Sequence, residues 1–488
     1  MGSFVSRSAD QLQRSSDWSQ WSVTVAGLGV AGYSCADALM QLGARVTVID
    51  SGSGQRQQKR AEILRELEVT VLLDHQTGLP AATDLLVVSP GLPPSHPLIR
   101  EALERGVPVW GELELAWRLR DPDGAAAWLC VTGTNGKTTT TLMLESMLRA
   151  AGYRTCAAGN IGLSLVDVVM HDDMEVIAVE VGAPQLPFVH SVSPVASACL
   201  NIADDHIDHF GSLEAYVAAK ARLFDRTQDA IVYNEQDPTT RAMAEEADVI
   251  DGCRAIGFTL GAPGLSMLGV VDDLLIDRAF IEDRATTAQE LATVADVRPL
   301  APHNVANALA AAALARAFGV PPSAVRDGLR AFEPAEHRIC LVGSVNGVDY
   351  VDDSKATNAH AARTSLGAYE SIVWIAGGLA KGQEFDDLVQ ASAQRLRGVV
   401  LIGTDRARIA GALARHAPDV PVIEVASTET GAMVQAVEAA TGLAQPGDTV
   451  LLAPGCASWD MFTDYTDRGR QFASAAQGLS GFVSSAGE

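Results

Sequence analysis

The strongest chemical signal in this sequence of 488 residues is a glycine-rich stretch with one lysine and several hydroxyls: Thr132-Gly133-Thr134-Asn135-Gly136-Lys137-Thr138-Thr139. It follows an apolar segment, residues 127–131, that is typical of a buried strand, and it precedes a stretch with helical periodicity. Small residues leave backbone N–H groups free to point at phosphate oxygens, Lys137 adds a positive charge, and Thr138 offers a hydroxyl to Mg²⁺. Val131 stands where the strict phosphate-loop pattern has its first glycine, so a structural turn is the alternative.

Two segments that follow apolar strands have the side chains of a metal site. Residues 176–179 are apolar and end in Glu180, the arrangement by which nucleotide-binding α/β domains bring a carboxylate to a metal ion. After a further strand, two imidazoles and three carboxylates occur within six residues, in Asp204-Asp205-His206-Ile207-Asp208-His209. This density favours a metal site that includes His206, although Mg²⁺ prefers oxygen ligands. A solvated acidic loop is the alternative.

A second glycine turn lies near the start of the sequence, between a strand-like segment at 22–26 and a helical stretch: Gly27-Leu28-Gly29-Val30-Ala31-Gly32. A second strand, residues 44–49, ends at Asp50, which is close to the spacing expected of a dinucleotide-binding fold. Such a turn lets the backbone approach a pyrophosphate at a helix N-terminus. An NAD-dependent oxidoreductase is therefore an alternative, but it leaves the loop at 133–138 unexplained.

Polar loops follow apolar strands again in the last third of the chain, after Glu336-His337-Arg338. The first is Asp352-Asp353-Ser354-Lys355-Ala356-Thr357-Asn358, and the others are Gly377-Gly378-Leu379-Ala380-Lys381-Gly382 and Pro454-Gly455-Cys456-Ala457-Ser458-Trp459-Asp460. Open α/β sheets bind ligands at the carboxyl ends of their strands. Taken alone, the first could also be a capped helix start, and each of the others a plain loop.

Taken in order, these motifs resemble those of the Mur ligase family of peptidoglycan synthesis, over about residues 22–472. The matching positions are Gly133 to Thr139, Asn160 in Gly159-Asn160-Ile161-Gly162, Glu180, His206, Lys220, His303-Asn304 with Asn307, and His337-Arg338. The segment Asp353 to Asn358 is similar to that of the members that add D-glutamate. The D-N-P-R motif of the members that add diaminopimelate is absent.

The resemblance implies an ATP-dependent amide ligase that adds D-glutamate to UDP-N-acetylmuramoyl-L-alanine. ATP would phosphorylate the L-alanyl carboxylate, and the amine of D-glutamate would displace phosphate from the acyl phosphate. Because this chemistry brings anions together, ATP would act with Mg²⁺, two ions by resemblance, and with cationic side chains.

The resemblance also implies a role for each matching residue. The catalytic residues would be Lys137, His206, Lys220 and Lys355. The metal would be held by Thr138, Glu180, His206 and Lys220, the last carbamylated by CO₂. ATP would contact the loop at 133–139, Asn304, Asn307, Arg338 and Asp353. The UDP substrate would contact Gly27, Leu28, Gly29, Val30, Gly32, Asp50, Asn160 and Gln185. D-Glutamate would contact Thr357, Lys381, Ser458 and Tyr465.

Two positions depart from the family pattern. The family usually has a Ser-Ser-Phe-Gln run after the metal glutamate, whereas this chain has Gly182-Ala183-Pro184-Gln185, without the two hydroxyls. Tyr465 stands where a phenylalanine is usual. Because of the first change, a protein that binds ATP without ligase activity remains an alternative. Another Mur-type or folylpolyglutamate-type ligase is a further alternative, against which the segment 353–358 and Lys381 argue.

The elements that must position these residues alternate between strand and helix, which predicts an α/β fold with mostly parallel sheets. We predict a disordered leader at 1–20 and a Rossmann-like domain for the UDP substrate at 21–115. A central P-loop-type ATPase domain follows at 116–336. The last predicted domain is a Rossmann-like C-terminal domain at 337–488 that binds D-glutamate and closes on ATP.

Composition limits the partners. The 60 Asp and Glu against 36 Lys and Arg give a net charge of −24, which argues against nonspecific nucleic-acid binding. The seven cysteines are scattered and form no C-x-x-C pair, so neither a disulfide framework nor a zinc knuckle is predicted. No apolar run reaches the length of a membrane span or of a signal peptide. We expect a cytoplasmic, monomeric enzyme of small-molecule substrates.

Overall fold

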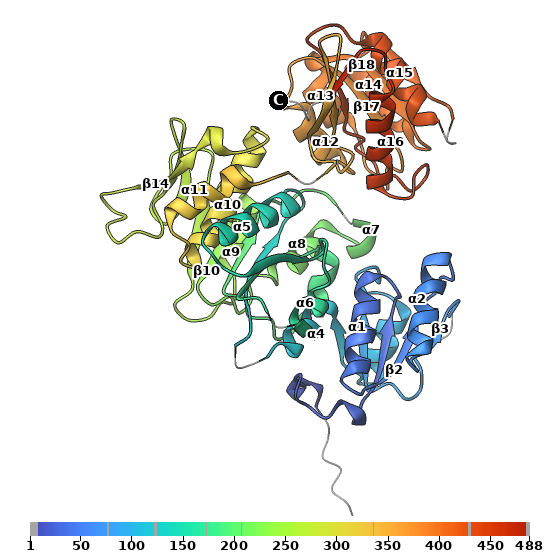
Figure 1. Ribbon diagram of the computed structural model, residues 1–488, viewed down its shortest axis with the longest axis vertical. Coiled ribbons are helices and arrows are strands. Elements are labelled where there is room, and N and C mark those ends of the chain that lie inside the picture. Colours follow the sequence, from blue (N-terminus) through green and yellow to red (C-terminus); the bar gives the residue numbers. More distant parts are fainter. Residues whose placement is uncertain are drawn as a thin grey trace, which may run out of the picture. The chain divides into compact units, whose positions relative to one another are not determined.

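Three β-sheets with flanking helices make up the chain in the computed structural model, which describes residues 8–75, 78–121, 124–171, 173–205, 207–334, 336–427 and 431–484 (Figure 1). The chain forms two compact units, Met1–Phe332 and Glu333–Glu488. The first unit contains two of the sheets and the second unit contains the third. The predicted α/β class with parallel-rich sheets is confirmed. The domain boundaries at 115/116 and 336/337 remain predictions.

The first sheet has five parallel strands in the order β3-β2-β1-β4-β5. Its strands are β1 (Ser22–Ala26), β2 (Arg45–Ile49), β3 (Thr70–Leu72), β4 (Leu85–Val88) and β5 (Val109–Gly111). Its helices are α1 (Val30–Gln41), α2 (Gln55–Glu66), α3 (Pro97–Glu104) and α4 (Glu112–Leu119). The buried strand β4, all apolar, is typical of a parallel sheet covered on both faces.

The second sheet has nine strands in the order β14-β13-β12-β11-β10-β9-β6-β8-β7, parallel from β7 to β12 and antiparallel beyond. Its strands are β6 (Ala127–Thr132), β7 (Thr155–Gly159), β8 (Val176–Glu180), β9 (Ala196–Cys199), β10 (Ala230–Asn234), β11 (Arg254–Phe258), β12 (Met267–Val271), β13 (Leu274–Asp277) and β14 (Gln289–Thr293). Its α-helices are α5 (Lys137–Ala150), α6 (Leu165–His171), α7 (Ile207–Phe210), α8 (Leu213–Ala221), α9 (Pro238–Glu245), α10 (Pro302–Ala317) and α11 (Pro322–Ala331). The alanine-rich α10 is almost wholly buried and packs against α5, because its small side chains allow close approach.

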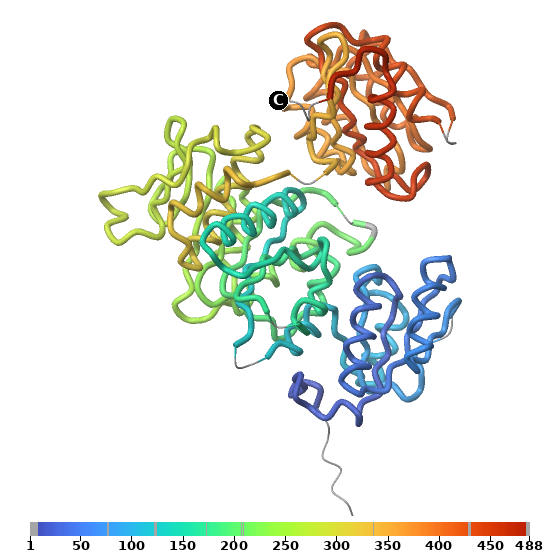
Figure 2. The backbone as a smooth tube through the Cα atoms, viewed as in Figure 1, coloured from blue at the N-terminus to red at the C-terminus, as the bar shows by residue number. Residues whose placement is uncertain are grey.

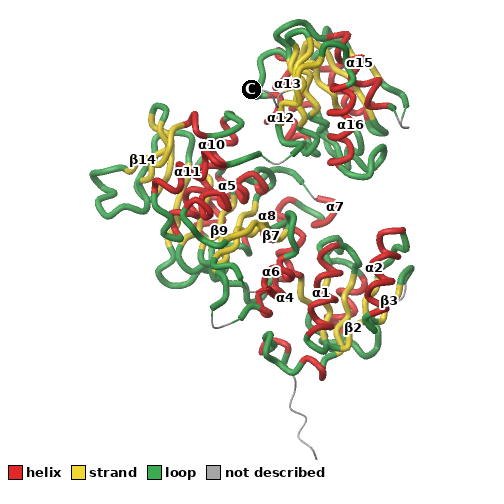
Figure 3. Tube along the Cα trace, in the orientation of Figure 1, coloured by secondary structure: helices red, strands yellow, loops and turns green. Residues whose placement is uncertain are grey.

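The second unit has seven strands in the order β19-β18-β17-β20-β16-β15-β21, parallel except at β15. Its strands are β15 (Cys340–Val345), β16 (Val348–Asp352), β17 (Ile372–Gly377), β18 (Leu396–Ile402), β19 (Val422–Glu424), β20 (Thr449–Leu452) and β21 (Phe482–Ser484). Its helices are α12 (Ala359–Leu366), α13 (Asp386–Ser392), α14 (Arg406–His416), α15 (Ala432–Leu443) and α16 (Tyr465–Gln477). Figure 3 shows these strands flanked by helices, and Figure 2 follows the backbone through each unit.

The predicted disordered leader at 1–20 is wrong for residues 8–20, whereas residues 1–7 lie outside the described part. Two 3-10 turns, Ala9–Gln11 and Trp18–Gln20, are present, each with an N-cap side chain that accepts a backbone N–H. Trp18 is fully buried and, with Leu12, belongs to the core of the first unit. The free energy gained by burying the apolar surface of Trp18 outweighs the tendency to disorder that the polar composition of this segment predicts. Within the described residues no helix is long and apolar enough to cross a membrane.

Candidate active site

The phosphate loop connects β6 to α5, and two glycines give it its shape. Gly133 and Gly136 have φ values of +151° and +85°, where side chains with a Cβ are strained. A Cβ on Gly136 would lie 2.3 Å from Asn307 Oδ1, and one on Gly133 would lie 3.0 Å from Leu200 Cβ. Since α5 begins at Lys137, the N-terminus of this helix faces the loop, as an anion site requires.

Lys137 and Thr138, the first residues of α5, turn toward the loop and the neighbouring strand. The Lys137 ammonium donates to the carbonyl oxygens of Gly133 at 2.8 Å and Thr134 at 2.9 Å. The Thr138 hydroxyl donates to Glu180 Oε2 at 2.7 Å, and Asn160 Nδ2 donates to Glu180 Oε1 at 2.9 Å. The structure therefore brings together the hydroxyl and the carboxylate that the sequence predicted as metal ligands. Thr139 follows on the same helix, half-buried.

Lys220, on α8, is buried beneath the loop and is not a solvated helix lysine. Its ammonium donates to Gly133 O at 2.8 Å and to Thr132 Oγ1 at 3.3 Å, and it lies 4.9 Å from the centre of the Tyr216 ring. Burial, and then the nearby charge of Lys137, lower the pKa of Lys220 to about 7. A large fraction of this amine is then neutral at neutral pH.

The acidic segment after β9 is tied to the same loop by residues to which the sequence assigned no role. Asn201 Oδ1 accepts from Asn135 N at 2.9 Å, and Asn201 Nδ2 donates to Asn135 O at 3.0 Å. The hydroxyls of Thr134 and Tyr216 are 3.0 Å apart. His206 lies outside the described residues, and among those described no three His, Cys, Asp or Glu side chains are grouped to hold a metal ion. The proposed role of His206 stays a prediction.

Asn304 and Asn307 lie one turn apart on α10, and both are buried. Asn307 Nδ2 donates to Asn304 Oδ1 at 3.3 Å, and Asn304 Nδ2 donates to Pro299 O at 2.9 Å. The close approach of Asn307 to Gly136 places this pair beside the phosphate loop. This position fits the predicted role in binding the nucleotide, which stays a prediction.

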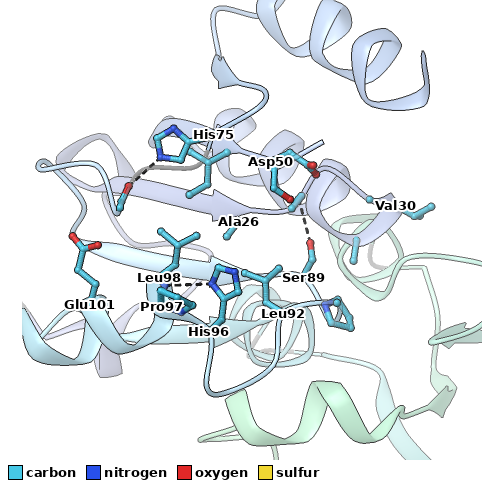
Figure 4. Close-up of a pocket in the computed structure, with 18 residues that line it drawn as sticks. Ala26, Val30, Asp50, His75, Ser89, Leu92, His96, Pro97, Leu98 and Glu101 are labelled. Carbon is cyan, nitrogen blue, oxygen red and sulfur yellow. Dashed lines mark hydrogen bonds between the residues drawn. The ribbon is translucent and has the colours of Figure 1, made fainter. Parts of the chain in front are cut away.

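A cavity of about 640 Å³ opens at the carboxyl end of the first sheet (Figure 4). Of the predicted contacts, Gly27, Gly29, Val30 and Asp50 line it. Leu28 and Gly32 serve the turn itself: Leu28 N donates to Asp50 Oδ2 at 2.6 Å, and a Cβ on Gly32 would lie 1.8 Å from Gly27 O.

The sequence assigned no role to several other residues that line this cavity: His75, Ser89, Gly91, His96 and Glu101. The Ser89 hydroxyl donates to Gly27 O at 3.1 Å, so the two loops that follow β1 and β4 meet here. The Ser89-Pro90-Gly91 turn directly after a buried strand was the available signal. In Figure 4 Asp50 and Ser89 lie near Val30, whereas His75 and Glu101 lie farther along the cavity.

Asn160, directly after β7, donates to Glu180, and Gln185 lies close to Asn160 in the segment that follows β8. Gln185 is buried, and its Oε1 accepts from Gly182 N at 2.8 Å. A Cβ on Gly182 would lie 3.2 Å from Asn160 Oδ1 and 3.4 Å from Gln185 Oε1. The two amides thus already crowd the space that a serine at 182 would use.

In the second unit, the three polar loops that follow β16, β17 and β20 are joined by backbone hydrogen bonds. Gly455 N donates to Ala356 O at 2.8 Å, and Leu379 and Ala457 exchange hydrogen bonds of 2.9 and 3.0 Å. The loops that carry Thr357, Lys381 and Ser458, the predicted D-glutamate contacts, are therefore neighbours.

A buried arginine that the sequence did not indicate also connects these loops. Arg468, on α16, donates to Ser354 Oγ at 2.9 Å, Ser354 O at 2.7 Å and Cys456 O at 3.0 Å. Burial lowers its pKa to about 10, so it stays charged at neutral pH. It holds the loop after β16 to the loop after β20.

The predicted nucleotide residues of the second unit lie beside the same loops. Asp353 is buried next to Ser365, and burial raises its pKa to about 7, whereas the nearby charge of Arg338 lowers it. The Lys355 ammonium lies 3.8 Å from the centre of the Tyr465 ring.

A UDP-N-acetylmuramoylalanine--D-glutamate ligase of Streptomyces avermitilis is 60% identical over 464 residues, which are 95% of this chain and 99% of that protein. The chain belongs to the Mur ligase family. The Mur ligase MurD-like N-terminal domain matches residues 21–111, the Mur ligase middle domain residues 131–315, and the Mur ligase glutamate ligase domain residues 337–456. The resemblance read from the motifs, to the family and within it to MurD, is confirmed.

Other Mur ligases share the sequence or the fold. The ligase of the same name from Thermobifida fusca is 53% identical over 462 residues, 94% of this chain and 98% of that protein. Among solved structures, MurC of Thermotoga maritima has a TM-score of 0.56 at 19% identity, covering 93% of this chain and 99% of its own. MurF of Acinetobacter baumannii has a TM-score of 0.56 at 17% identity, and the match covers 93% of this chain and 90% of the MurF chain. At these identities the structures support the fold alone.

Proposed function

We propose that the chain is an ATP-dependent ligase that adds D-glutamate to UDP-N-acetylmuramoyl-L-alanine, for peptidoglycan precursors in the cytoplasm. The observation that carries the proposal is the phosphate loop. Lys137, Thr138 and the buried Lys220 converge on it, in a chain that is 60% identical to a ligase of that name.

The donors beside the loop fit Mg²⁺. The Thr138 hydroxyl and the Glu180 carboxylate are oxygen ligands held 2.7 Å apart, and oxygen is what this ion prefers. Bound there, Mg²⁺ would neutralise the charge of the transferred phosphoryl group. The neutral amine of Lys220 is the form that adds CO₂, and a carbamate would turn this lysine into a further oxygen donor. We propose two Mg²⁺ ions, with His206 as a ligand of the second.

The residues of the loop would act on the phosphates of ATP. The N-terminus of α5 and the Lys137 ammonium would hold the γ-phosphoryl group while the L-alanyl carboxylate attacks it. ADP leaves, and an acyl phosphate forms. The D-glutamate amine then attacks the acyl carbon, and phosphate leaves as the amide forms. Asn304, Asn307, Arg338 and Asp353 would bind the rest of the nucleotide, with Lys355 beside them.

The other substrates would bind at the remaining polar sites. The cavity of about 640 Å³, with its glycine turn and Asp50, would take the UDP portion, and Asn160 and Gln185 the muramoyl side. Thr357, Lys381, Ser458 and Tyr465 would bind D-glutamate. We further propose that the protein is a monomer of three domains whose last domain closes on ATP.

Phosphate release from ATP and Mg²⁺ with UDP-N-acetylmuramoyl-L-alanine tests the proposal. D-Glutamate is compared with L-glutamate, D-aspartate and meso-diaminopimelate as the acceptor. We expect release that requires both the muramoyl substrate and D-glutamate. Folded protein that binds ATP but releases no phosphate with any acceptor would refute the ligase, and would direct attention to Gly182 and Ala183.

A further inference from the structure

Trp459 is an exposed tryptophan at the carboxyl end of the third sheet, directly after Ser458. Its side chain is 65% exposed, whereas Trp374, in the same unit, is fully buried. A large aromatic ring in water forgoes the free energy that burial would supply. Its exposure beside the joined loops calls for a local explanation.

The ring of Trp459 has a specific neighbour. The Lys381 ammonium lies 4.4 Å from the centre of the ring, which is the distance of a cation–π contact. Lys381 has a φ of +49° and is followed by Gly382 at +80°, so a tight turn presents this side chain. Within the described residues the ammonium has no hydrogen-bond or ion-pair partner, and its N–H donors stay available to a ligand.

We propose that Trp459 is a positioning residue that holds the Lys381 ammonium ready for the side-chain carboxylate of the acceptor amino acid. A lysine side chain loses conformational entropy when its ammonium is fixed by a ligand. A contact that already fixes the ammonium before binding lowers the entropy cost of binding the ligand. The ring covers one face of the ammonium and leaves the other for the carboxylate, where the loop that carries Ser458 joins the loop that carries Lys381. Trp459 thereby favours acceptors that carry a second carboxylate. The inference rests on the proposed ligase function.

The substitutions Trp459→Leu and Trp459→Phe test this role, with Val434→Ala as the control. Val434 is an exposed apolar residue of the same unit, on α15, a helix that carries none of the predicted site residues. We expect Trp459→Leu to raise the KM for D-glutamate about two- to fivefold, the value of an exposed cation–π contact. The kcat and the KM for ATP stay within a factor of two. Trp459→Phe, which keeps a ring, gives a smaller increase, and Val434→Ala gives none.

A fluorescence measurement tests the same contact without turnover. Acrylamide quenches exposed tryptophans, and quenching that Trp459→Phe removes belongs to Trp459. With a nonhydrolysable ATP analogue and the muramoyl substrate present, we expect D-glutamate to reduce this quenching component.

The outcomes separate the two proposals. Absence of phosphate release by the wild-type protein with D-glutamate would refute the ligase itself. Normal release with an unchanged KM for D-glutamate in Trp459→Leu would overturn the role of Trp459 alone. So would equal increases of the KM for D-glutamate and for ATP, or quenching by acrylamide that D-glutamate leaves unchanged.

Discussion

Replacing Lys220 by methionine should change how stability depends on pH, because a buried ammonium is costly. The folded pKa of Lys220 is about 7, lowered from 10.5 by burial and then by Lys137. Between these values the unfolded chain holds a proton that the folded chain does not, so the free energy of unfolding rises with pH across the window. Below pH 7 the cost is at its largest, and above about 10.5 it vanishes.

The magnitude follows from the shift. Each pKa unit corresponds to about 1.4 kcal/mol, so the full cost of the ammonium is about 5 kcal/mol below pH 7. Between pH 7 and pH 9 the stability of the wild-type protein should rise by about 2 kcal/mol relative to Lys220→Met. Methionine is similar in size to lysine and uncharged. The contributions of all other titrating groups therefore cancel in the difference between the unfolding free energies of the two proteins.

Urea unfolding of both proteins at pH 7 and pH 9, in buffers free of CO₂ and bicarbonate, measures this difference. Tryptophan fluorescence follows the unfolding, because five of the seven tryptophans, Trp128 on β6 among them, lie in the same unit as Lys220. A difference between the proteins that does not vary with pH, or that changes in the opposite direction, would refute the assignment of a lowered pKa to Lys220. Added bicarbonate should stabilise the wild-type protein only, if the amine is carbamylated.

Three further substitutions have definite expected outcomes. Gly136→Ala puts a Cβ 2.3 Å from Asn307 Oδ1 at a φ of +85°, so ATP-analogue affinity by titration calorimetry should fall about tenfold or more, and unchanged affinity would contradict the loop geometry. Glu180→Gln keeps the size of the side chain but removes the charge beside Thr138. We expect kcat to fall about 100-fold and the Mg²⁺ concentration required for activity to rise. Activity with an unchanged Mg²⁺ dependence would exclude Glu180 as a ligand. Arg468→Met leaves the carbonyls of Ser354 and Cys456 without their donor, so thermal unfolding of the second unit should show a loss of about 1–3 kcal/mol, and equal stability would show that the guanidinium is dispensable.

Much of the fold and of the phosphate loop could be predicted because the signals are local. A strand, a glycine-rich turn and the helix after it are each specified by neighbouring residues, and the structure contains all three. The leader was the clear failure. Its polar composition predicts disorder, yet Trp18 finds apolar partners that lie far along the chain.

Contacts between distant residues could not be predicted from the residues alone. Nothing near Lys220 in the sequence indicates that its helix packs under Gly133, 87 residues earlier. Nothing near Arg468 in the sequence indicates that its side chain is buried against Ser354, 114 residues earlier. The pairing of Lys381 with Trp459 depends on the order of β17 and β20 in the sheet.

The sequence by itself determined which groups are present for binding and catalysis: a phosphate loop, a glycine turn for a second pyrophosphate, and polar loops at the ends of strands. Backbone conformation and side-chain type are properties of single residues and their neighbours, and they can be read from short segments. Only the tertiary structure decided which amine has a lowered pKa, which cation is buried and which aromatic ring stays in water. Those properties depend on burial and on the charges nearby, and both arise from the packing of segments that are far apart in the chain.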